Sequence, residues 1–268
     1  MKANPMAEQP IRFDDGAAYE RMMGVWSRLA GEIFLDWLAP RQGLKWIDVG
    51  CGNGAFTELI VARSAPAKVS GVDPSDGQLA YARTRKGTEI AEFRQGDAMA
   101  LPFPDRAFDV AIMALVIFFV PEPARGVAEM VRVAAPGGTV AAYAWDIMGG
   151  GFPLQPVQTE LKAMGFTPAR PPSFEASTIE ALRKLWTDAG LVEVETRRIE
   201  VQRSFVDFED FWGAVTAAPT LGDLLAKLAP DDLAGLKARV RTHLREDSAG
   251  QISYGAWANA IKGRLPSR

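Results

Sequence analysis

The sequence predicts an α/β fold in which a doubly wound, mostly parallel sheet has helices on both faces. Short apolar runs alternate with longer helical patterns across residues 45–145, which is the rhythm of consecutive strand–helix–strand units. The first run, 45–49, leads into glycine at every second position of 50–54 and then into a helical pattern. The run 108–115 is apolar throughout, as in a central strand buried on both faces.

Seven strands are expected in a single domain spanning residues 1–268, since 268 residues suffice for one large α/β domain. The predicted strands are 45–49, 68–72, 92–95, 108–115, 139–145, 192–205 and 251–261. The predicted helices are 16–38, 55–63, 78–86 with 74–76 as its opening, 123–134, 156–164, 178–189 with Ser177 as its N-cap, and three stretches within 207–247.

Two segments interrupt the alternation. Residues 146–176 hold three consecutive glycines and five prolines, and residues 206–250 are mostly helical. With ordinary connections both insertions lie at the carboxyl ends of the strands, so we expect them to form a helical lid over the site where an acceptor binds. Residues 1–15 are polar and are expected to form a loose arm.

Composition excludes some classes of partner. The formal net charge is −3, so there is no basic footprint for nucleic acid. The basic cluster 83–86 is mixed with acidic residues and is interpreted as a solvated helix end. The longest apolar stretch, 110–120, is 11 residues long, which is too short to cross a bilayer. Residues 1–5 lack the apolar core of a signal peptide, and the single cysteine, Cys51, suits a reducing compartment, so a cytoplasmic location is expected.

The glycine turn predicts a nucleotide-like ligand at the carboxyl end of the first strand. Gly50, Gly52 and Ala55 satisfy the dinucleotide pattern G-x-G-x-x-A, and Asp73 follows Gly54 by 19 residues, where an acid meets a ribose. A carboxylate accepts well from both ribose hydroxyls, in a dinucleotide site and in an adenosyl site alike. The spacing alone leaves both ligands open.

The context favours the adenosyl ligand. Asp48 extends the turn to Asp48-x-Gly50-x-Gly52-x-Gly54, and the third strand ends in Gly96-Asp97-Ala98. Leu101-Pro102-Phe103-Pro104, Phe108-Asp109-Val110 and Arg132-Val133-Ala134-Ala135-Pro136-Gly137-Gly138 follow in order. Together, across residues 46–145, these motifs resemble the class I S-adenosylmethionine-dependent methyltransferases, and among them the small-molecule group that includes the quinone-biosynthesis enzymes. The stretches 19–27 and 208–212 look, more loosely, like a bacterial subgroup of these enzymes.

The resemblance implies the Rossmann-like methyltransferase fold, S-adenosyl-L-methionine as cofactor and S-adenosyl-L-homocysteine as product. It implies that Asp48 and the turn hold the methionine and ribose parts, that Asp73 binds the ribose diol and that Asp97 meets the adenine amino group. The helix 16–38 would lie over the cofactor, with Arg28 pairing with its carboxylate. The implied cofactor-binding residues are Tyr19, Trp26, Arg28, Asp48, Gly50, Cys51, Gly52, Asn53, Gly54, Asp73, Pro74, Gln78, Asp97, Ala98, Ala114 and Leu115.

The acceptor side is less defined. The family often has a histidine after the fourth strand, and residues 116–120 contain none. The candidate acceptor contacts are Phe118, Phe119, Trp145 and Trp212, because aromatic faces suit a cationic sulfonium. Asp146, at the end of the fifth strand, is a further candidate. No catalytic residue is assigned. The single histidine, His243, is interpreted as a surface residue, and Cys51 as a small residue filling the turn. No metal-ligand spacing is present.

The sequence therefore predicts methyl transfer from S-adenosylmethionine to a small, hydrophobic or aromatic acceptor through an O, N or C atom, by a monomer or homodimer. A non-catalytic regulatory protein that keeps the cofactor site is one alternative. An NAD-dependent oxidoreductase is another, and a protein or RNA methyltransferase a third, although the charge balance disfavours RNA.

Overall fold

A computed structural model of the chain describes residues 20–167, 170–217 and 219–267. The strands are β1 (Lys45–Val49), β2 (Lys68–Asp73), β3 (Ala91–Gln95), β4 (Phe108–Ala114), β5 (Ala134–Trp145), β6 (Val192–Phe205), β7 (Arg245–Glu246) and β8 (Ile252–Arg264). The helices are η1 (Glu20–Gly24), α2 (Val25–Leu38), α3 (Ala55–Ser64), α4 (Asp76–Thr84), η2 (Ile117–Phe119), α5 (Pro123–Val133), α6 (Gln155–Ala163), η3 (Phe174–Ser177), α7 (Ile179–Asp188), α8 (Phe208–Thr216), α9 (Pro219–Leu225) and α10 (Pro230–Thr242).

The strands form one sheet in the order β3-β2-β1-β4-β5-β8-β6, and the two-residue strand β7 pairs with β8. The pairs from β3 to β5 are parallel, whereas β8 runs antiparallel to both β5 and β6. The predicted fold class is confirmed, with seven strands along the main path and β7 added beside them.

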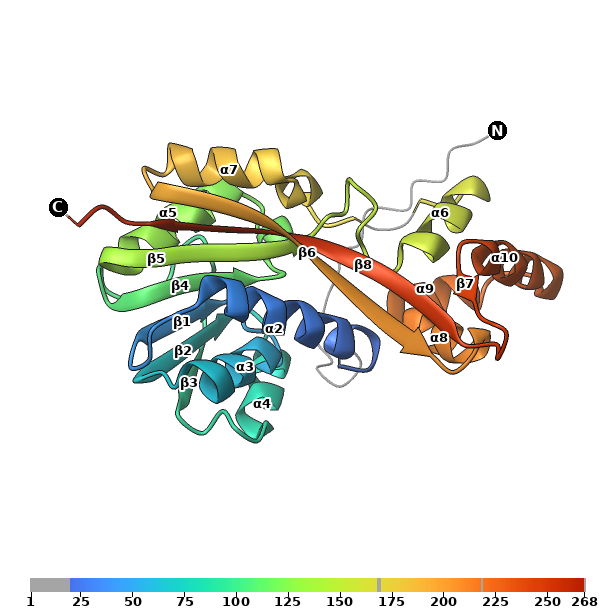
Figure 1. The fold of residues 1–268 in the computed structure, drawn as a ribbon, viewed down its shortest axis with the longest axis horizontal. Coiled ribbons are helices and arrows are strands. Elements are labelled where there is room, and N and C mark those ends of the chain that lie inside the picture. The colour runs from blue at the N-terminus through green and yellow to red at the C-terminus, as the bar shows by residue number, and fades with distance from the viewer. Residues whose placement is uncertain (1–19, 168–169, 218, 268) are drawn as a thin grey trace.

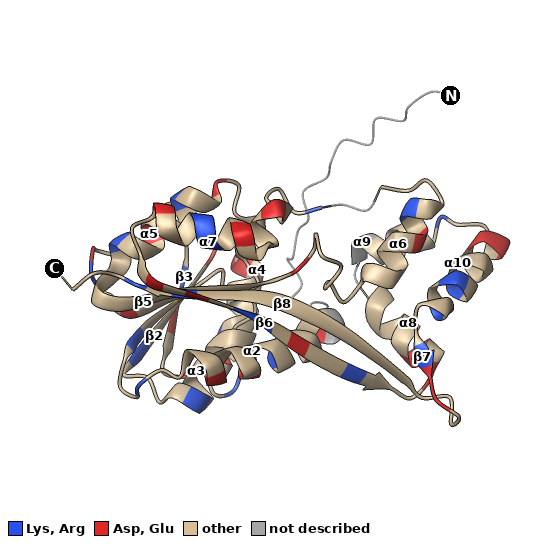
Figure 2. Ribbon diagram, turned by 45° about the horizontal axis from the view of Figure 1, so that its top comes forward, with Lys and Arg blue, Asp and Glu red and all other residues tan. Residues whose placement is uncertain are grey.

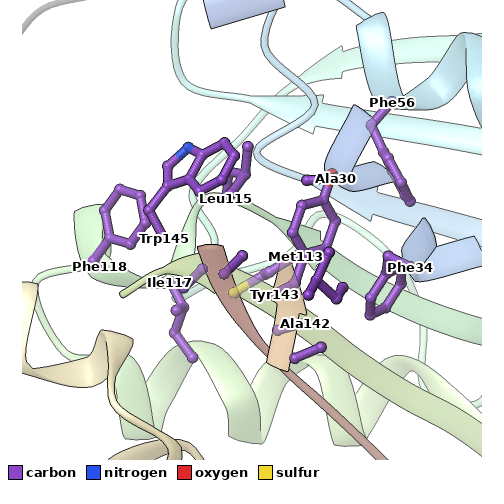
Figure 3. Close-up of a cluster of buried hydrophobic side chains, with 14 of the residues drawn as sticks. Ala30, Phe34, Phe56, Met113, Leu115, Ile117, Phe118, Ala142, Tyr143 and Trp145 are labelled. Atoms are coloured by element: carbon purple, nitrogen blue, oxygen red, sulfur yellow. The ribbon is translucent and has the colours of Figure 1, made fainter. Parts of the chain in front are cut away.

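Helices cover both faces of the sheet (Figure 1). Helices α2, α3 and α4 lie on one face, and α5 and α7 lie on the other. Phe34 of α2 packs on Tyr143 of β5 with a ring-centroid distance of 4.7 Å, and Phe56 of α3 packs on both rings. Figure 3 shows Phe34, Phe56 and Tyr143 gathered on the same side of the sheet, so the apolar face of α2 is part of the core.

The strands β6 and β8 extend beyond the carboxyl end of β5. Trp145, the last residue of β5, pairs with Ala258, which in turn pairs with Ile199. From there the two strands continue together to Phe205 and Ile252. Helices α6, α8, α9 and α10 gather around this overhang (Figure 1), so the two insertions lie at the carboxyl edge of the parallel strands.

Several boundaries differ from the prediction for local reasons. β5 begins at Ala134 instead of residue 139, because the Pro-Gly-Gly segment interrupts its pairing with β4 without ending it. Helix α4 begins at Asp76, within the predicted opening 74–76, and the Ser75 side chain caps it by accepting a hydrogen bond from the Gln78 amide; it ends at Thr84, two residues earlier than predicted. Thr178, and not Ser177, is the N-cap of α7 and accepts from the Ala181 amide.

Candidate functional site

The glycine turn between β1 and α3 is attached to the neighbouring strand β2. The amides of Gly50 and Cys51 both donate to the Val72 carbonyl, at 2.7 and 3.0 Å. Gly50, Gly52 and Gly54 all have positive φ, at +75°, +51° and +78°. This left-handed conformation is available to glycine without a Cβ clash, so three glycines let the chain turn sharply from strand to helix.

Gly50 and Gly52 serve different purposes. A Cβ on Gly50 would lie 2.5 Å from Cγ1 of Val116, so this glycine allows the turn to pack against the segment after β4. A Cβ on Gly52 would meet only the Gln78 Oε1 atom within 4 Å, at 3.9 Å. The main chain at Gly52 is therefore the part of the turn that a ligand can approach closely.

Asp73 lies beside Gly52 at the end of β2. One of its oxygens accepts from the Gly52 amide and the other from the Ser75 amide, both at 2.9 Å. Burial raises the pKa of Asp73 above its usual range, while the two backbone hydrogen bonds act in the opposite direction. The carboxylate is held in one orientation next to the open side of the turn, with lone pairs left for further donors.

Asp48 lies beneath the turn and is fully buried. Its Oδ2 accepts from the Thr57 hydroxyl at 2.7 Å, and its Oδ1 has no hydrogen-bond partner among the described residues. Burial raises the pKa of Asp48 to about 7; the Thr57 hydrogen bond lowers it and Asp73 raises it further. An orphaned, buried carboxylate oxygen is costly and fits a turn that receives a polar ligand.

Asn53 is joined to two residues that the sequence analysis missed, Glu20 and Arg85. Its side-chain amide donates to Glu20 at 3.0 Å, and its main-chain carbonyl accepts from Arg85 Nε at 3.0 Å. Arg85 also pairs with Glu20 at 2.6 Å and with Glu58 of α3 at 2.8 Å. The interpretation of residues 83–86 as a solvated helix end is therefore wrong for Arg85, whose side chain is only 13% exposed.

The segment after β3 lies beside Asp73, because the Gly96 amide donates to the Asp73 carbonyl at 3.2 Å. Asp97 itself is exposed, and its Oδ1 accepts from the Met99 amide at 2.8 Å. Ala98 is partly buried. The tertiary structure thus brings the two acidic strand ends, Asp73 and Asp97, to one edge of the sheet.

The end of β4 is strained. Leu115 has a φ of +62° and donates its amide to the Tyr143 carbonyl at 2.8 Å. A left-handed residue other than glycine costs about 1–2 kcal/mol, and such strain is found often at functional sites. Helix η2 follows this turn and carries Phe118 and Phe119. The ring centroids of these two residues are 4.6 Å apart.

Trp145 is 1% exposed, and its indole N–H has no hydrogen-bond partner among the described residues. Figure 3 shows its ring beside Phe118 and Leu115. Asp146 is committed to a turn, since it accepts from the Trp257 indole at 3.1 Å and from the Gly149 amide at 2.8 Å. This is the capping role that is common for an acid at a strand end.

Trp212 of α8 is 8% exposed and stacks on Phe208, with Lys237 of α10 at 5.4 Å from its ring. His243, expected at the surface, is 38% exposed and lies 2.7 Å from Glu160 of α6. Helix α10 is therefore joined to α8 and to α6 by these contacts. Cys51 is buried, which raises the pKa of its thiol, in keeping with a small residue that fills the turn.

Not all residues predicted on helix 16–38 reach the turn. Tyr19 lies outside the described residues. Trp26 is 1% exposed and packs edge-on against Tyr254, so it contributes to the core. Arg28 is exposed; it pairs with Glu32 at 3.1 Å and lies 4.0 Å from Glu58 of α3, so its pairing with the cofactor carboxylate stays a prediction.

Among the described residues, no group of three or more His, Cys, Asp or Glu side chains is arranged to hold a metal ion. No helix in that part of the chain is long and apolar enough to cross a membrane.

Comparison with known proteins agrees with this geometry. A family model described as a methyltransferase domain matches residues 47–142. The ubiquinone/menaquinone biosynthesis C-methyltransferase of Roseobacter denitrificans is 36% identical over 115 residues, which cover 41% of this chain and 46% of that protein. The phosphatidylethanolamine N-methyltransferase of Cereibacter sphaeroides is 41% identical over 103 residues, covering 37% of this chain and 49% of that protein. The chain thus spans about half the length of the curated relatives that it matches.

Solved structures share the fold. The YcgJ protein of Bacillus subtilis has a TM-score of 0.61 at 16% identity, covering 88% of this chain and 98% of that one. Phosphoethanolamine N-methyltransferase 2 of Haemonchus contortus has a TM-score of 0.56 at 18% identity, covering 94% of this chain and 56% of that one. With the glycine turn, Asp73 and the strand order in place, residues 47–142 match the methyltransferase domain family, and there the chain is similar in sequence to ubiquinone/menaquinone biosynthesis C-methyltransferases.

Proposed function

We propose that the protein transfers a methyl group from S-adenosyl-L-methionine to a small, hydrophobic or aromatic acceptor. The observation that carries the proposal is the pairing of Gly52 with Asp73 on the open side of the glycine turn. The main chain at Gly52 is free of side-chain atoms at close range, and the Asp73 carboxylate is held directly beside it.

The described residues fit this cofactor. Asp73 has lone pairs for the ribose hydroxyls, and the orphaned Asp48 oxygen favours a polar ligand at the turn. Asp97 and Ala98, beside Asp73, are the proposed contacts of the adenine. The Haemonchus contortus neighbour was solved in complex with S-adenosyl-L-methionine, which supports the same class of ligand here. S-adenosyl-L-homocysteine is the proposed product.

When bound, this cofactor supplies an activated methyl group on a sulfonium. The chain's task is then to orient the acceptor and to exclude water, and orientation of this kind contributes roughly 7–11 kcal/mol. Phe118, Phe119 and Trp145 at the ends of β4 and β5 are the proposed walls of the acceptor site. The insertions 146–176 and 206–250, with Trp212, are proposed to cover it.

Titration calorimetry tests the cofactor. We expect S-adenosyl-L-homocysteine to bind and NAD to give no heat; binding of NAD alone would overturn the proposal in favour of an oxidoreductase. Asp73→Ala should weaken binding by about 1–3 kcal/mol, the scale of lost hydrogen bonds to a charged group. Asp76→Ala, an exposed acid at the start of α4, is the matched control and should bind normally.

A second assay tests turnover. The protein is incubated with methyl-labelled cofactor and a panel of phenols, quinols and amines, and label transfer is followed by mass spectrometry. Transfer to one member identifies the acceptor atom. Cofactor binding without transfer across the panel would favour the regulatory alternative.

A further inference from the structure

One charged residue lies within an apolar row on the overhanging part of β6. The residues of β6 that face α2 and α8 alternate along the strand, as strand geometry requires. Ile199, Val201 and Phe205 of this row are buried, at 1%, 6% and 1% exposure. Arg203 occupies the remaining position of the row and is partly buried. The alternation therefore directs a guanidinium toward the interior side of the overhang.

The guanidinium of Arg203 lies among aromatic rings. Its Cζ is 4.5 Å from the ring centroid of Phe205 and 6.0 Å from that of Trp26. Its Nη1 is buried and has no hydrogen-bond partner among the described residues. A charged donor left buried without an acceptor is costly, so this arrangement requires an explanation.

The surrounding charges do not supply that acceptor. Burial lowers the pKa of Arg203 and Asp210 acts in the opposite direction, yet an arginine stays charged in proteins. The Asp210 carboxylate accepts from the Val206 amide at 3.0 Å and acts on Arg203 only through space. The positive charge is thus incompletely balanced within the described part of the chain.

A second donor lies across the strand pair. Tyr254 of β8 is directly opposite Arg203 in the register, so both side chains project from the same face. Its ring contacts Trp26 and Phe211, with centroid distances of 6.1 and 5.7 Å. Burial raises the pKa of Tyr254 to about 12, which keeps the phenol protonated and able to donate.

The position of these residues connects them to the site. Arg203 is four residues beyond Ile199, in the part of β6 that extends past the end of β5. Trp26 lies in the first turn of α2, which follows η1. Glu20 of η1 binds Asn53 of the glycine turn. Phe211 belongs to the lid helix α8. Arg203 therefore lies on the part of β6 that packs between α8 and α2, the helix that follows η1. In Figure 2 the part of β6 that extends toward α8 carries both an acidic and a basic segment.

We propose that Arg203 and Tyr254 bind an oxyanion, a carboxylate or a phosphate, carried by an apolar or aromatic methyl acceptor. The planar guanidinium donates two parallel hydrogen bonds to either group. The rings of Phe205 and Trp26, 4.5 and 6.0 Å from the guanidinium, make its surroundings apolar, which favours an acceptor with an apolar body. This inference rests on the proposed function, since it names the class of acceptor for the site.

The test uses the full chain saturated with S-adenosyl-L-homocysteine, which is titrated with benzoate, phenyl phosphate and neutral benzyl alcohol. Binding is followed by ligand-observed NMR, and the two anions distinguish a carboxylate from a phosphate. We expect at least one anion to bind and Arg203→Gln to weaken it by about 10–100-fold, the effect of losing a charge-assisted hydrogen bond. Tyr254→Phe should weaken anion binding less. Neither substitution should change the binding of benzyl alcohol.

Arg198→Gln is the matched control, because Arg198 lies on the opposite face of the same strand and already has Glu200 at 3.4 Å. It should leave anion binding unchanged. Affinity for S-adenosyl-L-homocysteine, measured in each variant, separates this proposal from the proposed function. The inference is overturned if neither anion binds to the cofactor-saturated protein, or if Arg203→Gln binds the anions as the unmodified protein does.

Discussion

Arg85 donates from Nε to the main-chain carbonyl of Asn53 at 3.0 Å, which fixes the middle of the glycine turn to the end of α4. The same guanidinium holds Glu20 and Glu58. One side chain thus joins the turn to η1 and to α3. We regard Arg85 as a positioning residue for the cofactor loop.

Replacing Arg85 should loosen that loop. Arg85→Gln is expected to weaken binding of S-adenosyl-L-homocysteine by about 1–2 kcal/mol, since hydrogen bonds to a charged group are lost behind the turn. Arg85→Lys should not restore affinity, because an ammonium lacks the planar fork that reaches three acceptors. Calorimetry measures both. Arg83→Gln, which removes an exposed contact to the Phe93 carbonyl, should bind normally; equal losses at positions 83 and 85 would argue against a positioning role.

A methyl group at Gly50 should destabilise the protein more than one at Gly43. Both glycines have a φ of +75°, but a Cβ on Gly43 meets nothing within 4 Å, whereas one on Gly50 overlaps Val116. Gly43→Ala should cost about 1–2 kcal/mol for the left-handed backbone. Gly50→Ala should cost about 1–3 kcal/mol more from the clash. Urea unfolding gives the difference, and Val116→Ala should recover part of it. Equal costs would show that the packing against Val116 relaxes freely.

Asp48 should make stability fall as pH rises. Its pKa is raised from 3.8 to about 7 in the folded chain, so its stabilising contribution is complete below pH 3.8 and is lost as pH rises to about 7. Asp48→Asn removes the ionisation, and should gain about 2 kcal/mol relative to the unmodified protein between pH 5 and pH 8. Urea unfolding without cofactor measures this gain. The exposed Asp36→Asn should show no such trend, and a pH-independent effect of Asp48→Asn would contradict the assigned ionisation.

The contact of Glu160 with His243 and Arg239 should hold helices α6 and α10 together. Glu160 accepts at 2.7 and 3.0 Å from these residues, and the His243 hydrogen bond lowers its pKa below 4.5. Its contribution is therefore present above pH 4.5 and lost as pH falls through the lowered value. Glu160→Gln should speed amide hydrogen exchange in α6 and α10 at pH 7, while Glu209→Gln, an exposed acid paired with Lys237, should change it little. Unchanged exchange in α6 would mean that apolar packing alone holds α6 against α10.

Much of the framework can be derived from local sequence pattern. The strand–turn–helix at residues 45–64 was predicted nearly to the residue, because apolar period and glycine spacing are local signals. The doubly wound, mostly parallel sheet followed from the alternation of elements, whereas the strand order is known from the structure. The proximity of Asp73 to Gly52 also follows, since parallel strands end at the same edge of the sheet.

The sequence pattern was misleading where a side chain's partner is distant. Arg85 was assigned to solvent although its partners are 27 and 65 residues away in the chain. Helical periodicity says which residues share a face, and does not say which face is covered.

The sequence by itself determined the sheet, the glycine turn and the acidic residues at the strand ends, because period, glycine spacing and strand-end position are properties of neighbouring residues. Only the tertiary structure decided that Glu20 and Arg85 hold the turn through hydrogen bonds to Asn53. It alone showed that β6 and β8 extend past β5 and carry Arg203 inward among aromatic rings. These relationships depend on the packing of distant segments, which fixes burial and partnership together and leaves no trace in local spacing.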